Sequence, residues 1–96
     1  MGKTMGLKFE WDENKAIENY SKHGVTFEEA ATAFADPLSR TIYDPDHSDD
    51  EDRFILLGET QGQKLVVVAH TDRNDTIRII SARKASRREG ANYEKS

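Results

Sequence analysis

The stretch that decides the fold is TIRIISARKASRRE, residues 76–89. Its isoleucines alternate with Arg78 at the period of two that is typical of a half-buried strand. From Ala82 onward, residues that favour helices replace the β-branched ones. The sequence therefore predicts a strand that leads into a helix over residues 83–94, with Ser81 as the residue that caps its first turn.

The same region is strongly basic. Residues 73–88 contain six cations and one anion, whereas the whole chain of 96 residues has a net charge of −4. Residues 1–70 contain seven cations and fourteen anions. An acidic chain is poorly suited to coat nucleic acid without specificity, but a basic C-terminal quarter is compatible with a focused phosphate-binding site. The acidic part is equally compatible with a basic protein partner.

Composition limits the classes of protein to consider. We expect a single domain over residues 1–96, with residues 1–6 as a disordered or non-native start. The absence of cysteine excludes disulfides and zinc sites built on thiolates. No apolar run approaches the ~20 residues that a membrane helix requires, and the N-terminus lacks a signal-peptide pattern. A cytoplasmic protein without membrane contact is therefore expected.

Hydrophobic spacing and capping residues predict the other elements. Asp12 is suited to cap a first helix and Gly24 to end it. Thr26 and Glu29 form the pattern of a capping box at the start of a second helix. The buried face of the first helix is expected to contain Ala16, Ile17 and Tyr20. The expected helices cover residues 13–22 and 27–35, and the expected strands cover residues 7–11, 38–43, 53–60 and 64–71.

The order of these elements predicts the fold class. A strand is followed by two helices, four strands and a final helix. Residues 66–68 are all valine, which indicates a central strand that is buried on both faces. Short connections favour an antiparallel meander with helices packed against it. The sequence therefore predicts an α+β fold in which two N-terminal helices follow a short strand and a C-terminal helix closes the chain.

The acidic stretch at residues 44–52 needs a separate interpretation. It holds six acidic residues and begins like a calcium-binding loop. However, the sixth position of that loop is Asp49 instead of glycine, and the twelfth is Ile55 instead of glutamate. We therefore interpret the stretch as a solvated loop, and we expect neither a metal nor another cofactor.

Five blocks of the chain, taken in order, resemble the BrnT family. They are FEWDENKA (9–16), KHGVTFEEA (22–30), FADP (34–37), DxxHSxxxxR (44–53) and RIISARKASRRE (78–89). BrnT proteins are toxins of type II toxin–antitoxin pairs with a RelE/ParE-like fold. The resemblance, which spans residues 7–93, implies a ribonuclease that inhibits translation.

The resemblance also implies the partners of the chain. A BrnA-type antitoxin of the ribbon-helix-helix class would neutralise the toxin, and RNA would be the substrate. Operator DNA would be contacted only through the antitoxin. Because such antitoxins dimerise, a heterotetramer of toxin and antitoxin is expected.

Cleavage of RNA without a metal requires a base for the 2′-hydroxyl, positive charge for the phosphate and an acid for the leaving oxygen. Arginine suits the phosphate because its planar fork donates paired hydrogen bonds and stays charged. Arg78 and Arg83 are the first candidates for this role, followed by Arg73. We expect His70 to converge with Arg78 and Arg83 as a base or acid, and His23 is the second catalytic histidine candidate. Further RNA-binding candidates are Lys84, Arg87, Arg88, Tyr93 and Ser81.

Each of these residues also has an alternative structural role. The arginines suit a solvated or antitoxin-facing surface, His70 suits a hydrogen-bonded core position, and His23 suits the end of a helix, where the helix dipole favours its charged form. Two alternative functions also stay open. One is a toxin-like binding module that pairs with an antitoxin but has no catalytic activity. The other is a toxin that poisons DNA gyrase.

Overall fold

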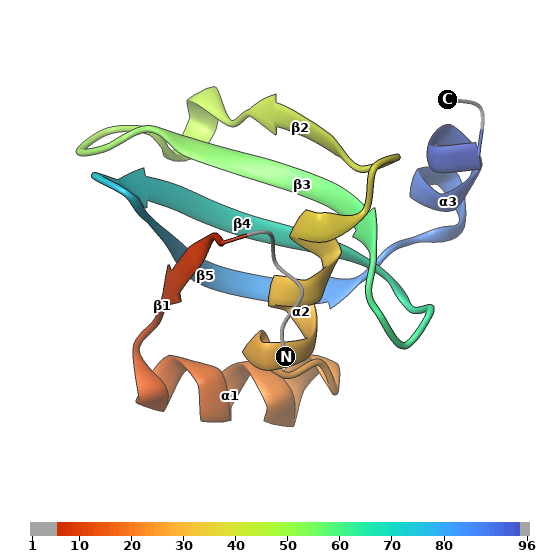
Figure 1. Cartoon of the computed structure of the whole chain (residues 1–96), viewed down its shortest axis with the longest axis horizontal. Coiled ribbons are helices and arrows are strands. Elements are labelled where there is room, and N and C mark those ends of the chain that lie inside the picture. Colours follow the sequence, from red (N-terminus) through yellow and green to blue (C-terminus); the bar gives the residue numbers. More distant parts are fainter. Residues whose placement is uncertain (1–5, 95–96) are drawn as a thin grey trace.

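The computed structural model describes residues 6–94 of the chain (Figure 1). Within this range the strands and helices follow the predicted order. They are β1 (Lys8–Glu10), α1 (Glu13–His23), α2 (Phe27–Thr32), β2 (Arg40–Tyr43), β3 (Arg53–Glu59), β4 (Leu65–Arg73), β5 (Thr76–Lys84) and α3 (Arg87–Glu94). Two short 3-10 turns, η1 (Ala33–Ala35) and η2 (Pro45–His47), follow α2 and β2. Residues 1–5 of the expected irregular start lie outside the described range.

The strands form one mixed sheet in the order β1-β5-β4-β3-β2. The strands β2 to β5 are antiparallel neighbours, as predicted, and β4 is central. The prediction of a wholly antiparallel sheet is wrong for β1, which pairs in parallel with β5 through Phe9 and Ile77. The chain returns along α1 and α2 before β2 begins, so β1 and β2 lie on opposite edges of the sheet (Figure 1). The fold class is therefore α+β with a mixed sheet.

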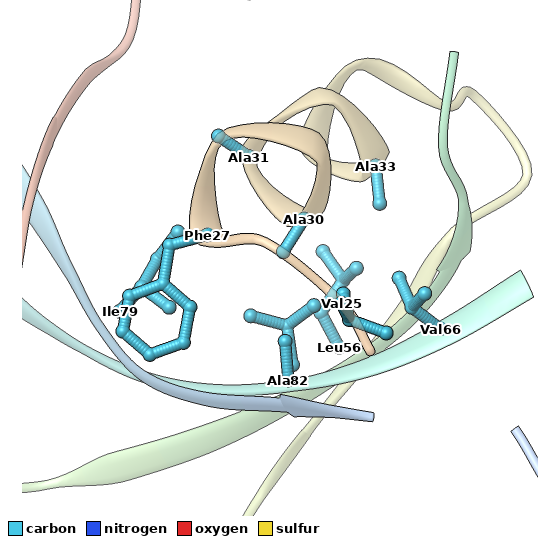
Figure 2. Packing of buried hydrophobic residues seen from close by; sticks show 10 residues of the cluster. Val25, Phe27, Ala30, Ala31, Ala33, Leu56, Val66, Ile79 and Ala82 are labelled. Atoms are coloured by element: carbon cyan, nitrogen blue, oxygen red, sulfur yellow. The ribbon is translucent and has the colours of Figure 1, made fainter. Parts of the chain in front are cut away.

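One face of the sheet forms the core with the two N-terminal helices. The helices α1 and α2 lie on the same side of the sheet (Figure 1). On the side of the strands, the buried core residues are Leu56, Val66, Val68, Ile79 and Ala82. On the side of the helices, they include Val25, Phe27, Ala30 and Ala33 (Figure 2). The predicted double burial of β4 is confirmed, since Val67 on the other face is only 8% exposed.

The opposite sheet face, which we call the open face, is not covered by α1 or α2 (Figure 1). Because side chains alternate along a strand, the strand registers define its members. They include Arg40, Ile42, Arg53, Ile55, Leu57, Val67, Thr71, Arg73, Arg78 and Arg83. Glu10 of β1 joins them because it pairs with Arg78. Arginines and aliphatic residues thus share one accessible surface.

Helix α1 has the predicted ends but not the predicted buried face. The Asp12 side chain accepts hydrogen bonds from the first turn, and Gly24 ends the helix with a φ of 70°. Ile17 and Tyr20 are 68% and 56% exposed, so their predicted burial is wrong. Asn19 is the buried residue of α1, because the helix turns this side chain toward β5.

Helix α2 starts with the predicted capping box of Thr26 and Glu29. After it, η1 crosses close to β3 at Gly58. A Cβ atom at Gly58 would lie 3.0 Å from the Ala33 carbonyl oxygen and 3.0 Å from the Ser39 Cβ. Glycine at this position therefore allows the helical layer to approach the sheet.

The boundary between the last strand and the last helix differs from the prediction. Strand β5 continues to Lys84, because residues 82–84 pair with residues 66–68 of β4. This ladder outweighs the helix propensity of the local sequence. Helix α3 begins at Arg87, and Ser86 caps it through reciprocal hydrogen bonds with Glu89. Ser81 is a strand residue, so its predicted capping role is wrong.

Candidate functional site

Two arginines and two glutamates gather on the open face near the β4–β5 turn, and we call them the Arg73–Arg78 cluster. Arg78 Nη1 donates to Glu10 Oε2 at 3.3 Å, and Arg73 Nη1 lies 3.8 Å from the same oxygen. Arg73 also donates from Nε and Nη2 to the two carboxylate oxygens of Glu51, at 3.3 and 3.2 Å. These hydrogen bonds lower the pKa of Glu51 and raise the pKa of Arg73. The cluster holds the exposed guanidinium group of Arg73 and the half-buried one of Arg78 beside two carboxylates.

A second ion pair lies at the other end of β5. Arg83 donates from Nη1 and Nη2 to the two carboxylate oxygens of Glu89, at 2.9 and 2.8 Å. The Ser86 amide donates to the same carboxylate at 2.7 Å. The hydrogen bonds from Arg83 are the main cause that lowers the pKa of Glu89 to about 2. This pair joins the first turn of α3 to the open face.

The predicted convergence of Arg78, Arg83 and His70 is wrong. Arg78 and Arg83 are five positions apart on one strand, which separates their backbones by roughly 15 Å. His70 pairs with Ile79, which lies on the core face. Its ring packs against Phe34 and Phe54, with centroid distances of 4.8 and 6.0 Å. Burial lowers the pKa of His70, so the ring is neutral at neutral pH and has no access to a substrate on the open face.

His23 and Ser81 lie close to each other but away from the Arg73–Arg78 cluster. They line a groove of about 200 Å³ between α1 and β5, together with Lys15 and Lys22. All four side chains are exposed. Glu18 also lines the groove, so it offers a polar surface of mixed charge beside the sheet edge, separate from the open-face arginines.

The remaining predicted RNA-binding residues lie at the C-terminal end of the described chain. Lys84 follows Arg83 in β5 and therefore points to the opposite sheet face. Arg87 and Arg88 are exposed on α3. The Tyr93 hydroxyl donates to Asp36 at 2.6 Å, and this hydrogen bond is the main cause that raises the pKa of Tyr93 to about 12. Tyr93 thus links α3 by a hydrogen bond to the segment before β2.

The sequence did not indicate several residues of the open face. Glu10 and Glu51 pair with the arginines, but they belong to a different edge strand and to the acidic loop. A hollow of about 210 Å³ lies between the sheet and α3. It is lined by Arg40, Ile42, Ile55, Leu57, Val67, Glu89 and Asn92. Only strand registers could have placed these aliphatic residues beside the arginines.

The described part of the chain contains neither a candidate metal centre nor a membrane-spanning helix. Among residues 6–94, no group of three or more His, Cys, Asp or Glu side chains is placed to hold a metal ion. No helix in this range is long and apolar enough to cross a membrane. The predictions of metal-independent chemistry and of a cytoplasmic location stay predictions.

The fold and site define a small α+β protein with an arginine-bearing sheet face. Residues 11–89 match the family model described as "Ribonuclease toxin, BrnT, of type II toxin-antitoxin system". The chain therefore belongs to the BrnT family of ribonuclease toxins, and membership of a type II system implies an antitoxin partner.

A solved structure supports the same assignment. The crystal structure of the Brucella abortus ribonuclease toxin BrnT is similar to this chain with a TM-score of 0.58 and 28% sequence identity. The similarity covers 84% of this chain and 99% of the Brucella chain. The comparison with curated proteins finds no match. The RelE/ParE-like label stays a prediction.

Proposed function

We propose that this chain is an endoribonuclease that cleaves RNA on the open face without a metal and thereby inhibits translation. The observation that carries this proposal is the pair of guanidinium groups beside Glu10, of which that of Arg73 is exposed and that of Arg78 is half-buried. Membership of the BrnT ribonuclease toxin family supports the reaction class. The clustering of Arg73, Arg78 and Glu10 supports the open face as the place where RNA is cleaved.

The two guanidinium groups suit the charge that develops during phosphodiester cleavage. The transition state carries additional negative charge on the phosphate oxygens, and arginine donates to such oxygens through paired N–H groups. Removal of one such donor typically slows catalysis by about 10²–10³-fold. Arg83 lies farther along β5 and would contact a different phosphate of the same RNA molecule. Glu10, Glu51 and Glu89 hold the three arginines in place until RNA arrives.

The antitoxin is proposed to be of the BrnA ribbon-helix-helix type and to cover the open face. The aliphatic hollow around Ile42, Ile55 and Leu57 would bury apolar residues of such a partner, and Arg40 would attract an acidic residue. An antitoxin dimer would bind two copies of this chain in a heterotetramer. Operator DNA would then be contacted through the antitoxin alone.

The test of the proposed function uses the purified chain with single-stranded RNA in excess EDTA. We expect cleavage of the RNA, arrest of protein synthesis in a bacterial extract, and loss of both effects when the cognate antitoxin is added. RNA that stays intact at a molar excess of the chain would contradict the proposal. DNA damage without arrest of translation would instead indicate a gyrase poison.

A second candidate function is supported by one specific observation. Arg73, Arg78 and Arg83 are each paired with a carboxylate of the same chain. This arrangement also suits a binding module that has no catalytic activity. Such a module would bind RNA with a steep dependence on salt but would leave it uncleaved.

A further inference from the structure

We propose that Glu10 is the general base of the reaction and takes the proton from the ribose 2′-hydroxyl at the scissile phosphate. This role rests on the proposed function, because it assigns a residue within the same site. The sequence did not single out Glu10. Its position follows from the parallel pairing of β1 with β5.

Glu10 is placed where a base is needed. It is the last residue of β1 and pairs in register with Arg78. Its Oε2 atom lies 3.3 Å from Arg78 Nη1 and 3.8 Å from Arg73 Nη1, so a phosphate held by the two arginines would lie beside the carboxylate. The side chain is 40% exposed, which leaves it accessible to RNA. A base must lie within hydrogen-bond distance of the proton that it removes.

Glu10 also keeps one oxygen available for a proton. Within residues 6–94, the hydrogen bond to its carboxylate goes to Oε2, and Oε1 accepts none. By contrast, Arg73 occupies both oxygens of Glu51. A carboxylate with one oxygen fixed by arginine and the other unbound is oriented and still able to accept a proton.

The other titratable groups are less suited to this role. Glu89 has both oxygens bound to Arg83, and its pKa of about 2 makes it a weak base. His70 is buried on the opposite sheet face. His23 lies in the groove between α1 and β5, and His47 contacts Asp44 in the acidic loop at 2.9 Å. Among residues 6–94, Glu10 is the carboxylate that forms ion pairs with both Arg73 and Arg78.

The proposed step is an internal transesterification. Glu10 Oε1 accepts the proton of the 2′-hydroxyl while the 2′-oxygen forms a bond to phosphorus. The bond from phosphorus to the 5′-oxygen breaks, and water supplies a proton to that oxygen. Arg73 and Arg78 donate hydrogen bonds to the non-bridging phosphate oxygens. The products are a 2′,3′-cyclic phosphate and a 5′-hydroxyl, and Glu10 returns its proton to the solvent.

The test compares Glu10→Gln with the wild-type chain, with Glu28→Gln as a control that removes the same charge from the exposed surface of α2. We expect E10Q to lower kcat by about 10²–10⁴-fold. The affinity of E10Q for an RNA analogue with 2′-deoxyribose at the cleavage position should equal or exceed that of the wild-type chain, because the variant removes a competitor for Arg78. E28Q should retain wild-type kcat.

Two further measurements separate a catalytic role from a structural one. Glu10→Asp retains a carboxylate and should recover part of the lost kcat, which also covers the case in which E10Q does not fold. End-group analysis should find cyclic phosphates in the products of the wild-type chain. Wild-type kcat in E10Q, an equal loss of affinity and kcat, or 3′-hydroxyl ends would overturn the role of Glu10 and leave the proposed function intact. A wild-type chain that cleaves no RNA would overturn both.

Discussion

The side chain of Asn19 pairs with the backbone of Ala82 as a neighbouring strand would. Asn19 Nδ2 donates to the Ala82 carbonyl at 2.8 Å, and the Ala82 amide donates to Asn19 Oδ1 at 3.1 Å. Asn19 Nδ2 also donates to the Val25 carbonyl at 3.1 Å. Strand β1 pairs with β5 only as far as Arg78, so Asn19 satisfies backbone groups that β1 does not reach.

Replacement of this amide should destabilise the fold. Asn19→Ala leaves the amide and carbonyl of Ala82 without their partner in a buried position, and we expect a loss of about 2–3 kcal/mol in the free energy of unfolding. Urea denaturation followed by circular dichroism measures this loss. Asn14→Ala on the exposed side of α1 is the matched control and should change stability by less than about 0.5 kcal/mol. Equal stability of the two variants would show that the Asn19 pairing contributes little.

The close approach at Gly58 makes a second stability prediction. Gly58→Ala places a Cβ within 3.0 Å of the Ala33 carbonyl oxygen, so we expect a loss of about 1–3 kcal/mol from overpacking. Gly62→Ala is the control, since its nearest neighbour atom would lie 3.8 Å away. Thermal unfolding of both variants tests the prediction, which fails if G58A is as stable as G62A.

The ion pair of Arg83 and Glu89 predicts a dependence of stability on acidity. The pKa of Glu89 is lowered from 4.5 to about 2, so the pair stabilises the fold fully above pH 4.5 and progressively less as the pH falls to about 2. NMR titration of the Glu89 carboxyl group should give a midpoint near 2. Arg83→Ala should raise that midpoint toward 4.5, whereas Arg87→Ala should leave it unchanged. An unchanged midpoint in R83A would contradict the assigned cause.

Glu51 should compete with RNA phosphate for Arg73. Glu51→Gln removes a carboxylate that binds both Nε and Nη2 of Arg73, and we expect the affinity for uncleavable RNA to rise about twofold to fivefold at low salt. Asp50→Asn in the same loop changes the net charge equally and serves as the control. Fluorescence anisotropy measures both affinities. An equal gain in the two variants would indicate a general effect of charge instead of competition at Arg73.

Local features of the fold could be predicted because their partners lie nearby in the sequence. The Asp12 cap, the Gly24 end and the capping box of Thr26 and Glu29 involve contacts within a few residues. The length of β5 could not be predicted, because it depends on the pairing of residues 82–84 with residues 66–68 of β4. The orientation of α1 could not be predicted either, because it depends on the pairing of Asn19 with Ala82, 63 positions away.

In the candidate site, too, local features could be predicted from the sequence, whereas contacts between distant residues could not. The alternation around Arg78 correctly indicated a strand, but the carboxylate of Glu10 reaches Arg78 across 68 positions of sequence. His70 follows a run of three buried valines, and such a run does not reveal which sheet face the histidine occupies. The burial of His70 against Phe34 and Phe54 could therefore be predicted only with knowledge of the register of the sheet.

The most direct test of the open-face site is the single-turnover rate of RNA cleavage by Arg78→Ala and Arg87→Ala, each in excess EDTA. The chain is present at a concentration that saturates the RNA, so that a loss of RNA affinity alone does not lower the rate. Both variants lose one arginine, but Arg78 lies in the Arg73–Arg78 cluster and Arg87 lies on the exposed surface of α3. We predict that R78A slows cleavage by about 10²-fold or more, and that R87A stays within about threefold of the wild-type rate. Equal rates for the two variants would contradict the location of the active site on the open face.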